Sequence, residues 1–134
     1  MAAQQRSPRT CPESFSALCQ LAAEPAAVGR ARLFVREQCE ASGVDADTTE
    51  TAVLLTSEVV TNAVLHGRSG PRLSITTSPE RLLVEVGDDN ARLPQMLDQD
   101  EDAVYGRGMN IVSLLATGWG AREDHRGKVV WFAL

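Results

Sequence analysis

The stretch Glu58-Val59-Val60-Thr61-Asn62-Ala63-Val64-Leu65-His66 decides the fold of this chain. It closes a long segment in which apolar residues recur at helical spacing until Gly67, so it predicts a helix. Glu58, Asn62 and His66 stand at i, i+4 and i+8 and form one polar line on that helix. A solvated stripe is the simplest interpretation of such a line. A polar cavity is the alternative, favoured by Asn62, because asparagine is a poor residue for an exposed helix.

Helix signals also mark the chain before this stretch. Asp47 and Glu50 have the spacing of a capping box and are expected to open the long helix. An earlier helix is predicted from Pro25, at its first turn, to a stop at Gly43, because apolar residues between them recur at helical spacing. The loose alternation of Ser14–Ala22 fits an edge strand or a loop.

Strand signals follow the long helix. Arg72–Thr77 and Leu82–Val86 alternate in polarity around a Ser-Pro-Glu turn and predict a β-hairpin. The polar segment Asp88–Tyr105 is too long for a simple connection, and loops of that length are usually functional or disordered.

The end of the chain predicts one more helix and one more strand. Gly106-Arg107-Gly108 is expected to launch a buried helix, Met109–Ala116, which Gly118 closes. Asp124–Gly127 predicts a turn, and Lys128–Leu134 a terminal strand. Hairpins separated from helices predict an α+β fold, a two-layer sandwich with a mainly antiparallel sheet. We expect residues 1–14 to form a flexible N-terminal arm and residues 15–134 to form one domain.

Composition narrows the class of protein. The chain has 134 residues, of which 43% are apolar, and 13 basic against 18 acidic side chains give a net charge of −5. An acidic chain without a basic cluster is not expected to bind nucleic acid or a membrane surface. No apolar run approaches the length of a membrane span, and the N-terminus lacks the pattern of a secretory signal, so we expect a cytoplasmic protein. The three cysteines form no CxxC pair, which argues against zinc.

Two further features could carry chemistry. Asp88 follows a predicted strand in the turn Gly87-Asp88-Asp89-Asn90, where an aspartate commonly serves only as a cap. Glycines at Gly106 and Gly108 leave backbone amides bare at a helix start, which suits an anion. The dinucleotide fingerprint, the P-loop, the hydrolase elbow and the HExxH motif are all absent from the sequence.

These signals, taken in order, resemble the GHKL ATPases. Glu58–His66 resembles the N box of that superfamily, Val84–Asp88 the approach to its G1 box, Gly106–Val112 its G2 box and Gly127–Phe132 its closing strand. The resemblance covers Ala22 to Leu134 and implies the Bergerat fold, a mixed, mainly antiparallel sheet covered on one face by helices. The small size, without a dimerisation or phosphoacceptor module, is similar to the RsbW-like anti-sigma-factor serine kinases.

The resemblance also implies roles for individual residues. Glu58 would be the catalytic base, Asn62 a ligand of Mg²⁺, and Asp88 the acceptor of the adenine amino group of ATP. Phosphates would be held by the amides of residues 106–109. Arg107 would lie near the γ-phosphate, although a surface arginine in a first helical turn is an equal alternative. The nucleotide-binding set expected from the resemblance is Asn62, His66, Asp88, Asn90, Gly106, Arg107, Gly108 and Met109.

Two departures from the family pattern predict reduced nucleotide affinity. Asn90 and Arg92 replace glycines of the G1 box, and Val129 stands where a hydroxyl usually helps to position adenine. The segment Ala91–Tyr105, equivalent to the ATP lid, carries four acids, Asp98 to Asp102, which we expect to face away from a triphosphate.

The resemblance leaves three functions open. The first is a Mg-ATP-dependent serine kinase that phosphorylates a STAS-domain anti-anti-sigma protein and binds an RNA polymerase sigma factor in the alternative complex. The second is a binding module of the same fold that sequesters such a partner without transferring phosphate. The third, the detached catalytic domain of a sensor histidine kinase, is disfavoured because the chain has no histidine-bearing dimerisation helix. A homodimer remains open.

Overall fold

The computed structural model describes residues 14–67, 69–90 and 103–134, and of residues 103–108 only the helical backbone. Residues 1–13 of the predicted N-terminal arm, Arg92 and the acids at 98–102 therefore lie outside the described residues. The elements follow the order β1 (Phe15–Gln20), α1 (Ala27–Ala41), α2 (Ala46–His66), β2 (Arg72–Thr77), β3 (Leu82–Asp88), α3 (Ala103–Leu115), β4 (Gly118–Asp124) and β5 (Gly127–Ala133).

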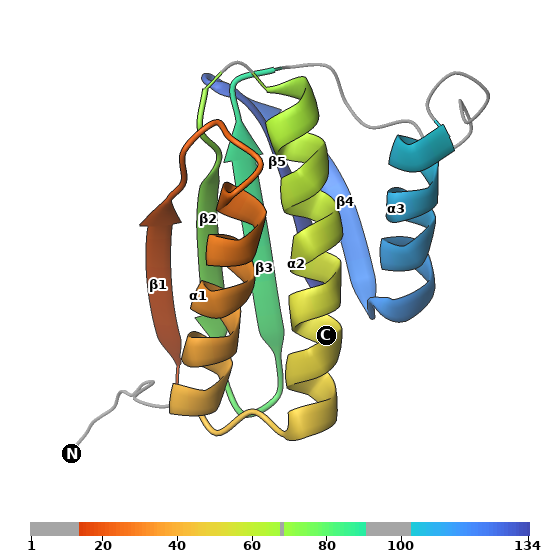
Figure 1. Cartoon of the computed structure of the whole chain (residues 1–134). Helices are drawn as coiled ribbons and strands as arrows, with labels where there is room; N and C mark the ends of the chain where they lie inside the picture. The colour runs from red at the N-terminus through yellow and green to blue at the C-terminus, as the bar shows by residue number, and fades with distance from the viewer. Residues whose placement is uncertain (1–13, 68, 91–102) are drawn as a thin grey trace.

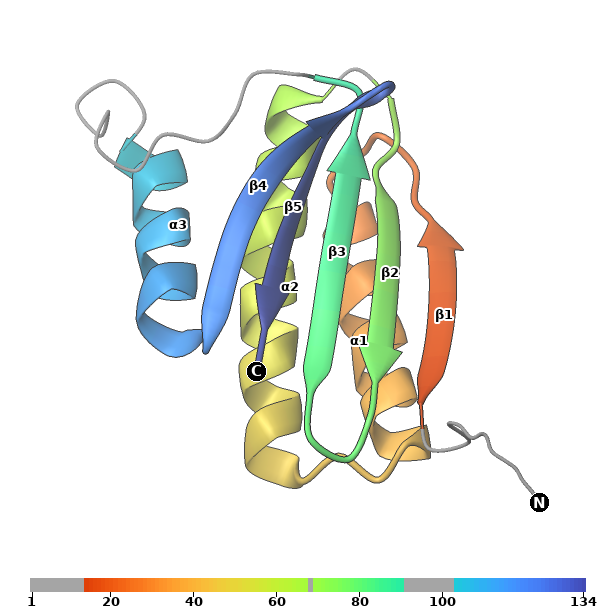
Figure 2. The same cartoon turned by 180° about the vertical axis from the view of Figure 1, so that it is seen from behind.

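The strands form a single sheet in the order β1-β2-β3-β5-β4, and every neighbouring pair is antiparallel. The helices lie on one face of this sheet (Figure 1), and the opposite face carries no helix (Figure 2). The structure thus confirms the predicted two-layer α+β sandwich and the edge strand at Phe15–Gln20. Within the described residues, no helix combines the length and apolar character that crossing a membrane requires.

The core lies between the sheet and the helices, and strand alternation determines which side chains enter it. In β2 and β3 every second residue is buried, including Leu73, Ile75, Val84 and Val86. Phe132 of β5 is fully buried in the same layer. The hydrophobic periodicity of the hairpin therefore specified both the strands and the face that they bury.

Helix α1 ends where the sequence predicted. Gly43 has a φ of 76°, and its amide donates to the Glu40 carbonyl while the Val44 amide donates to the Cys39 carbonyl over 2.9 Å. These two bonds form a Schellman motif, which requires the left-handed conformation that glycine adopts easily. The predicted start is different: Pro25 lies in a turn before the helix, which begins at Ala27.

The capping box predicted at Asp47 is wrong. Asp45 is the N-cap of α2, and its carboxylate accepts the Thr48 amide over 2.8 Å and the Thr48 hydroxyl over 3.0 Å. Asp45 has the extended backbone of a cap, whereas Asp47 already lies in the first helical turn. Glu50 instead forms an ion pair with Arg36 of α1.

Strand β4 was not expected from the sequence. Gly118 does not simply close the preceding helix but begins this edge strand, which pairs along its whole length with β5. Two glycines and charged residues hide its strand character, because glycine is depleted in strands. The space above Gly120 is taken by the indole of Trp131, whose nitrogen lies 2.9 Å from where a β-carbon would be. Asp124 forms the predicted turn by accepting the Arg126 and Gly127 amides.

Candidate functional site

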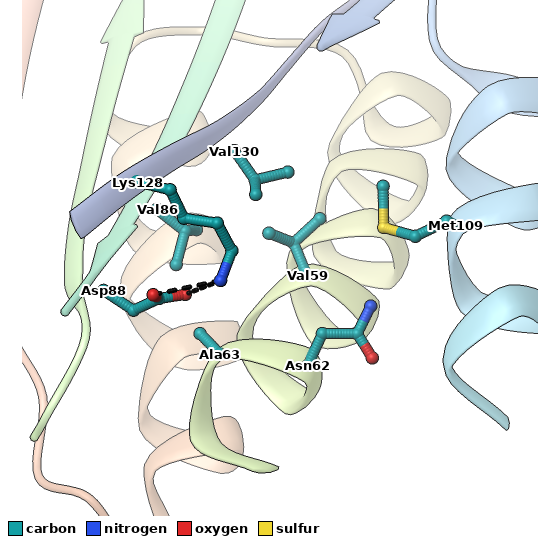
Figure 3. A pocket seen from close by; sticks show the side chains of 8 residues that line it. All are labelled: Val59, Asn62, Ala63, Val86, Asp88, Met109, Lys128 and Val130. Carbon is teal, nitrogen blue, oxygen red and sulfur yellow. Dashed lines mark hydrogen bonds and ion pairs between the residues drawn. The ribbon is translucent and has the colours of Figure 1, made fainter. Parts of the chain in front are cut away.

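Four elements meet around a small pocket with a cavity volume of about 10 Å³. Antiparallel register pairs Val86 with Val130 and Asp88 with Lys128, so these four side chains project from β3 and β5 toward the helices. Figure 3 shows them with the remaining lining residues, Val59, Asn62 and Ala63 of α2 and Met109 of α3. Positions i, i+3 and i+4 of a helix share a face, which explains why α2 presents these three together.

Asp88 and Lys128 form an ion pair at the sheet end of the pocket (Figure 3). The ammonium lies 3.0 Å from one carboxylate oxygen and 3.1 Å from the other. The Asp88 side chain is 1% exposed and the Lys128 side chain 4%. The carboxylate expected to accept the adenine amino group is therefore already bound to a cation from the neighbouring strand.

Asn90 ties this end of the pocket to the end of α2. Its amide donates to Asp88 over 2.8 Å, and its carbonyl accepts the Lys128 ammonium over 3.0 Å. Its side-chain amide donates to the His66 carbonyl over 2.6 Å. The asparagine that replaces a family glycine thus fixes the chain directly after β3.

Asn62 lies at the opposite end of the pocket, toward Met109 and α3 (Figure 3). It is 8% exposed, and its side-chain nitrogen has no hydrogen-bond partner among the described residues. A buried amide without a partner costs roughly 1–3 kcal/mol, so this position suits a bound polar group. Asn62 therefore supports the interpretation that the polar line on α2 faces a polar cavity at this position.

The other residues of the predicted site belong to α2 and α3. Glu58 is half-buried, one helical turn before Asn62, and is not a lining residue. His66 is half-buried at the end of α2. Gly106, Arg107 and Gly108 lie inside α3, which begins at Ala103 rather than after the glycines as expected. Alanine is the best helix former, which favours this earlier start.

Val129, which stands where the family usually has a hydroxyl, does not line the pocket as expected. Its register partner is Gly87, and both face a groove on the opposite side of the sheet together with Arg72. Lys128 occupies the pocket instead. Lys128 was not among the site residues expected from the sequence, although its place in phase with the buried Val130 and Phe132 was a usable signal.

The fold and the pocket define a class: an α+β sandwich whose site lies between one sheet face and two helices, with an aspartate at a strand end and an asparagine on the facing helix. Comparison with protein families matches residues 21–134 to the histidine kinase-like ATPase domain. The chain belongs to this family, within the GHKL superfamily. A search of curated proteins found no similar one.

Family membership indicates ATP binding, usually with Mg²⁺. The residues that line the pocket fit both ATP and Mg²⁺. Asp88 can accept an exocyclic amino group, and Asn62 offers an amide oxygen, a ligand that hard cations prefer. A single protein oxygen is sufficient where nucleotide phosphates complete the coordination, because Mg²⁺ is commonly held by one or two side chains plus phosphates.

Proposed function

We propose that the chain is a Mg-ATP-dependent serine protein kinase of the anti-sigma-factor type. Its substrate would be a serine of a STAS-domain anti-anti-sigma protein, and a sigma factor would be its partner in the alternative complex. The observation that carries the proposal is the placement of Asn62 and Asp88 at opposite ends of one pocket, which suits a metal-bound phosphate at one end and a base at the other.

Glu58 supports the transfer step in this proposal. It lies one turn from Asn62 on the same rigid helix, and the residue is only half-buried, which leaves part of it accessible to the hydroxyl of a partner protein. Bound Mg-ATP would supply the phosphoryl group and neutralise its charge. Glu58 would orient the serine hydroxyl or accept its proton, a contribution that is typically 10²- to 10⁴-fold in rate.

The experiment is transfer of radiolabelled phosphate from ATP to STAS proteins of the same genome. Glu58→Gln keeps the shape and removes the charge, so transfer should fall by roughly 10²- to 10⁴-fold while nucleotide and partner affinities stay unchanged. Glu50→Gln, on the same helix but paired with Arg36, is the matched control and should transfer normally. Transfer that is equally fast in Glu58→Gln would refute the role of this carboxylate.

One observation favours a second function, a binding module that transfers no phosphate. Lys128 forms an ion pair with Asp88, the carboxylate that should accept the nucleotide base. This ion pair favours a pocket with weak or no nucleotide binding. A native chain that binds a STAS protein or a sigma factor tightly, yet never labels it, would select this second function.

A further inference from the structure

Lys128 is placed where a nucleotide base would have to bind. Its ammonium projects into the pocket between Asp88 and Val59, as Figure 3 shows, and its side chain takes up part of the pocket. The cavity that remains, about 10 Å³, is far below the roughly 300–1,000 Å³ of most ligand pockets.

The ammonium also satisfies its own hydrogen-bonding capacity inside the protein. Its three donors meet three acceptors: both carboxylate oxygens of Asp88 and the carbonyl of Asn90, all within 3.1 Å. It therefore has no donor left for a base nitrogen, and it holds the acceptor that an exocyclic amino group needs.

We propose that Lys128 is an internal competitor of the nucleotide base for Asp88 and thereby sets the affinity of the pocket. Ammonium and exocyclic amino groups are both N–H donors, but the charge-assisted bond of the ammonium is roughly twice as strong. A neutral base displaces it only when stacking and phosphate contacts compensate. This inference rests on the nucleotide binding that the proposed function requires.

Calorimetric titration of Mg-ATP tests the competition with a matched pair of variants. Lys128→Met keeps the length of the side chain and removes the donors, so ATP affinity should rise roughly 10- to 100-fold, the equivalent of one charged hydrogen bond. Arg126→Met removes the same charge from an exposed position two residues away and should leave the affinity unchanged. Equal or weaker ATP binding by a folded Lys128→Met protein would overturn the inference.

A second measurement uses the native chain. Lys128 is the only lysine in the sequence, so ¹⁵N-lysine labelling gives a single side-chain ammonium signal in NMR spectra. Saturating Mg-ATP should shift this signal or abolish it, because the displaced ammonium exchanges its protons with water. An unchanged signal at saturation would overturn the inference while leaving ATP binding intact. Absence of ATP binding in both the native chain and Lys128→Met would refute the proposed kinase and the competition together.

Discussion

Asp88 near the end of β3 and Lys128 near the start of β5 are register partners, and their ion pair is closed off from solvent. The two residues come from strands that are adjacent in the sheet but separated in the chain by α3 and β4. The same ion pair is therefore expected to affect both the stability of the sheet and the binding of a ligand in the pocket.

Removal of one partner of this pair should destabilise the fold. Asp88→Ala leaves a buried ammonium without its counter-charge, and the free energy of unfolding should fall by about 3–5 kcal/mol. The double variant Asp88→Leu/Lys128→Met should regain most of that loss, because apolar residues of similar volume replace both charges. Urea unfolding of the native, single and double variants measures the difference. A double variant as unstable as Asp88→Ala would show that packing, rather than charge, holds this site.

Gly127 should be intolerant of a side chain. Its φ is 149°, and a β-carbon there would lie 2.3 Å from the carbonyl oxygen of Asp88. Gly127→Ala should therefore lower the free energy of unfolding by more than about 1 kcal/mol. Gly29→Ala is the control: this exposed glycine of α1 has no atom near its β position, so the change should stabilise by about 0.5–1 kcal/mol. Urea unfolding of both variants measures these changes. An unchanged free energy of unfolding in Gly127→Ala would contradict this turn geometry.

The N-cap of α2 predicts a pH-dependent effect. Hydrogen bonds from the Thr48 amide and hydroxyl lower the pKa of Asp45. A lowered folded-state pKa contributes stability that is present above the ordinary pKa and is lost as the pH falls through the folded value. Asp45→Ala should thus lower the melting temperature at pH 7, and the difference from the native chain should shrink below about pH 4.

Asp47→Ala is the control for this effect. Asp47 lies in the first turn of α2, so its loss should lower the melting temperature less. Thermal melts of both variants at several pH values make the comparison. A larger loss in Asp47→Ala would restore the capping box that the sequence predicted.

Asn62 should act through the metal. Asn62→Ala should weaken binding of Mg-ATP by at least about tenfold, with a smaller effect on metal-free ATP, because the amide oxygen would be lost to Mg²⁺. Leu65→Ala, an exposed change on the same helix, should affect neither. Titrations with Mg²⁺ and with a chelator separate the two affinities. Equal losses in both would assign Asn62 to the nucleotide rather than to the metal.

Sequence patterns predicted α2, the β2–β3 hairpin and β5 because their periodicity is strong and local. Strand β4 was missed because its glycines carry no strand signal and its stability comes from pairing with β5 and packing under Trp131. The cap of α2 was misplaced because two aspartates lie two residues apart, and only the backbone of Asp45 distinguishes them.

Part of the site was also predictable, because its motifs are local in the sequence. The motif order located Asp88 and Asn62, and both line the pocket. The contact between Asp88 and Lys128 depends on the register of two strands far apart in sequence, which local patterns do not specify. The roles expected for Glu58, His66 and the glycines of α3 remain predictions.

The most direct test of the central claim is calorimetric titration of ATP and GTP, each with Mg²⁺, into the native chain and into Asp88→Leu/Lys128→Met. The account predicts that the native chain prefers ATP, because a carboxylate accepts the adenine amino group and repels the carbonyl oxygen of guanine. The double variant, which lacks the carboxylate without leaving an unpaired charge, should lose ATP binding. Equal affinity for ATP and GTP in the native chain, or undiminished ATP binding by the double variant, would contradict an adenine site at Asp88.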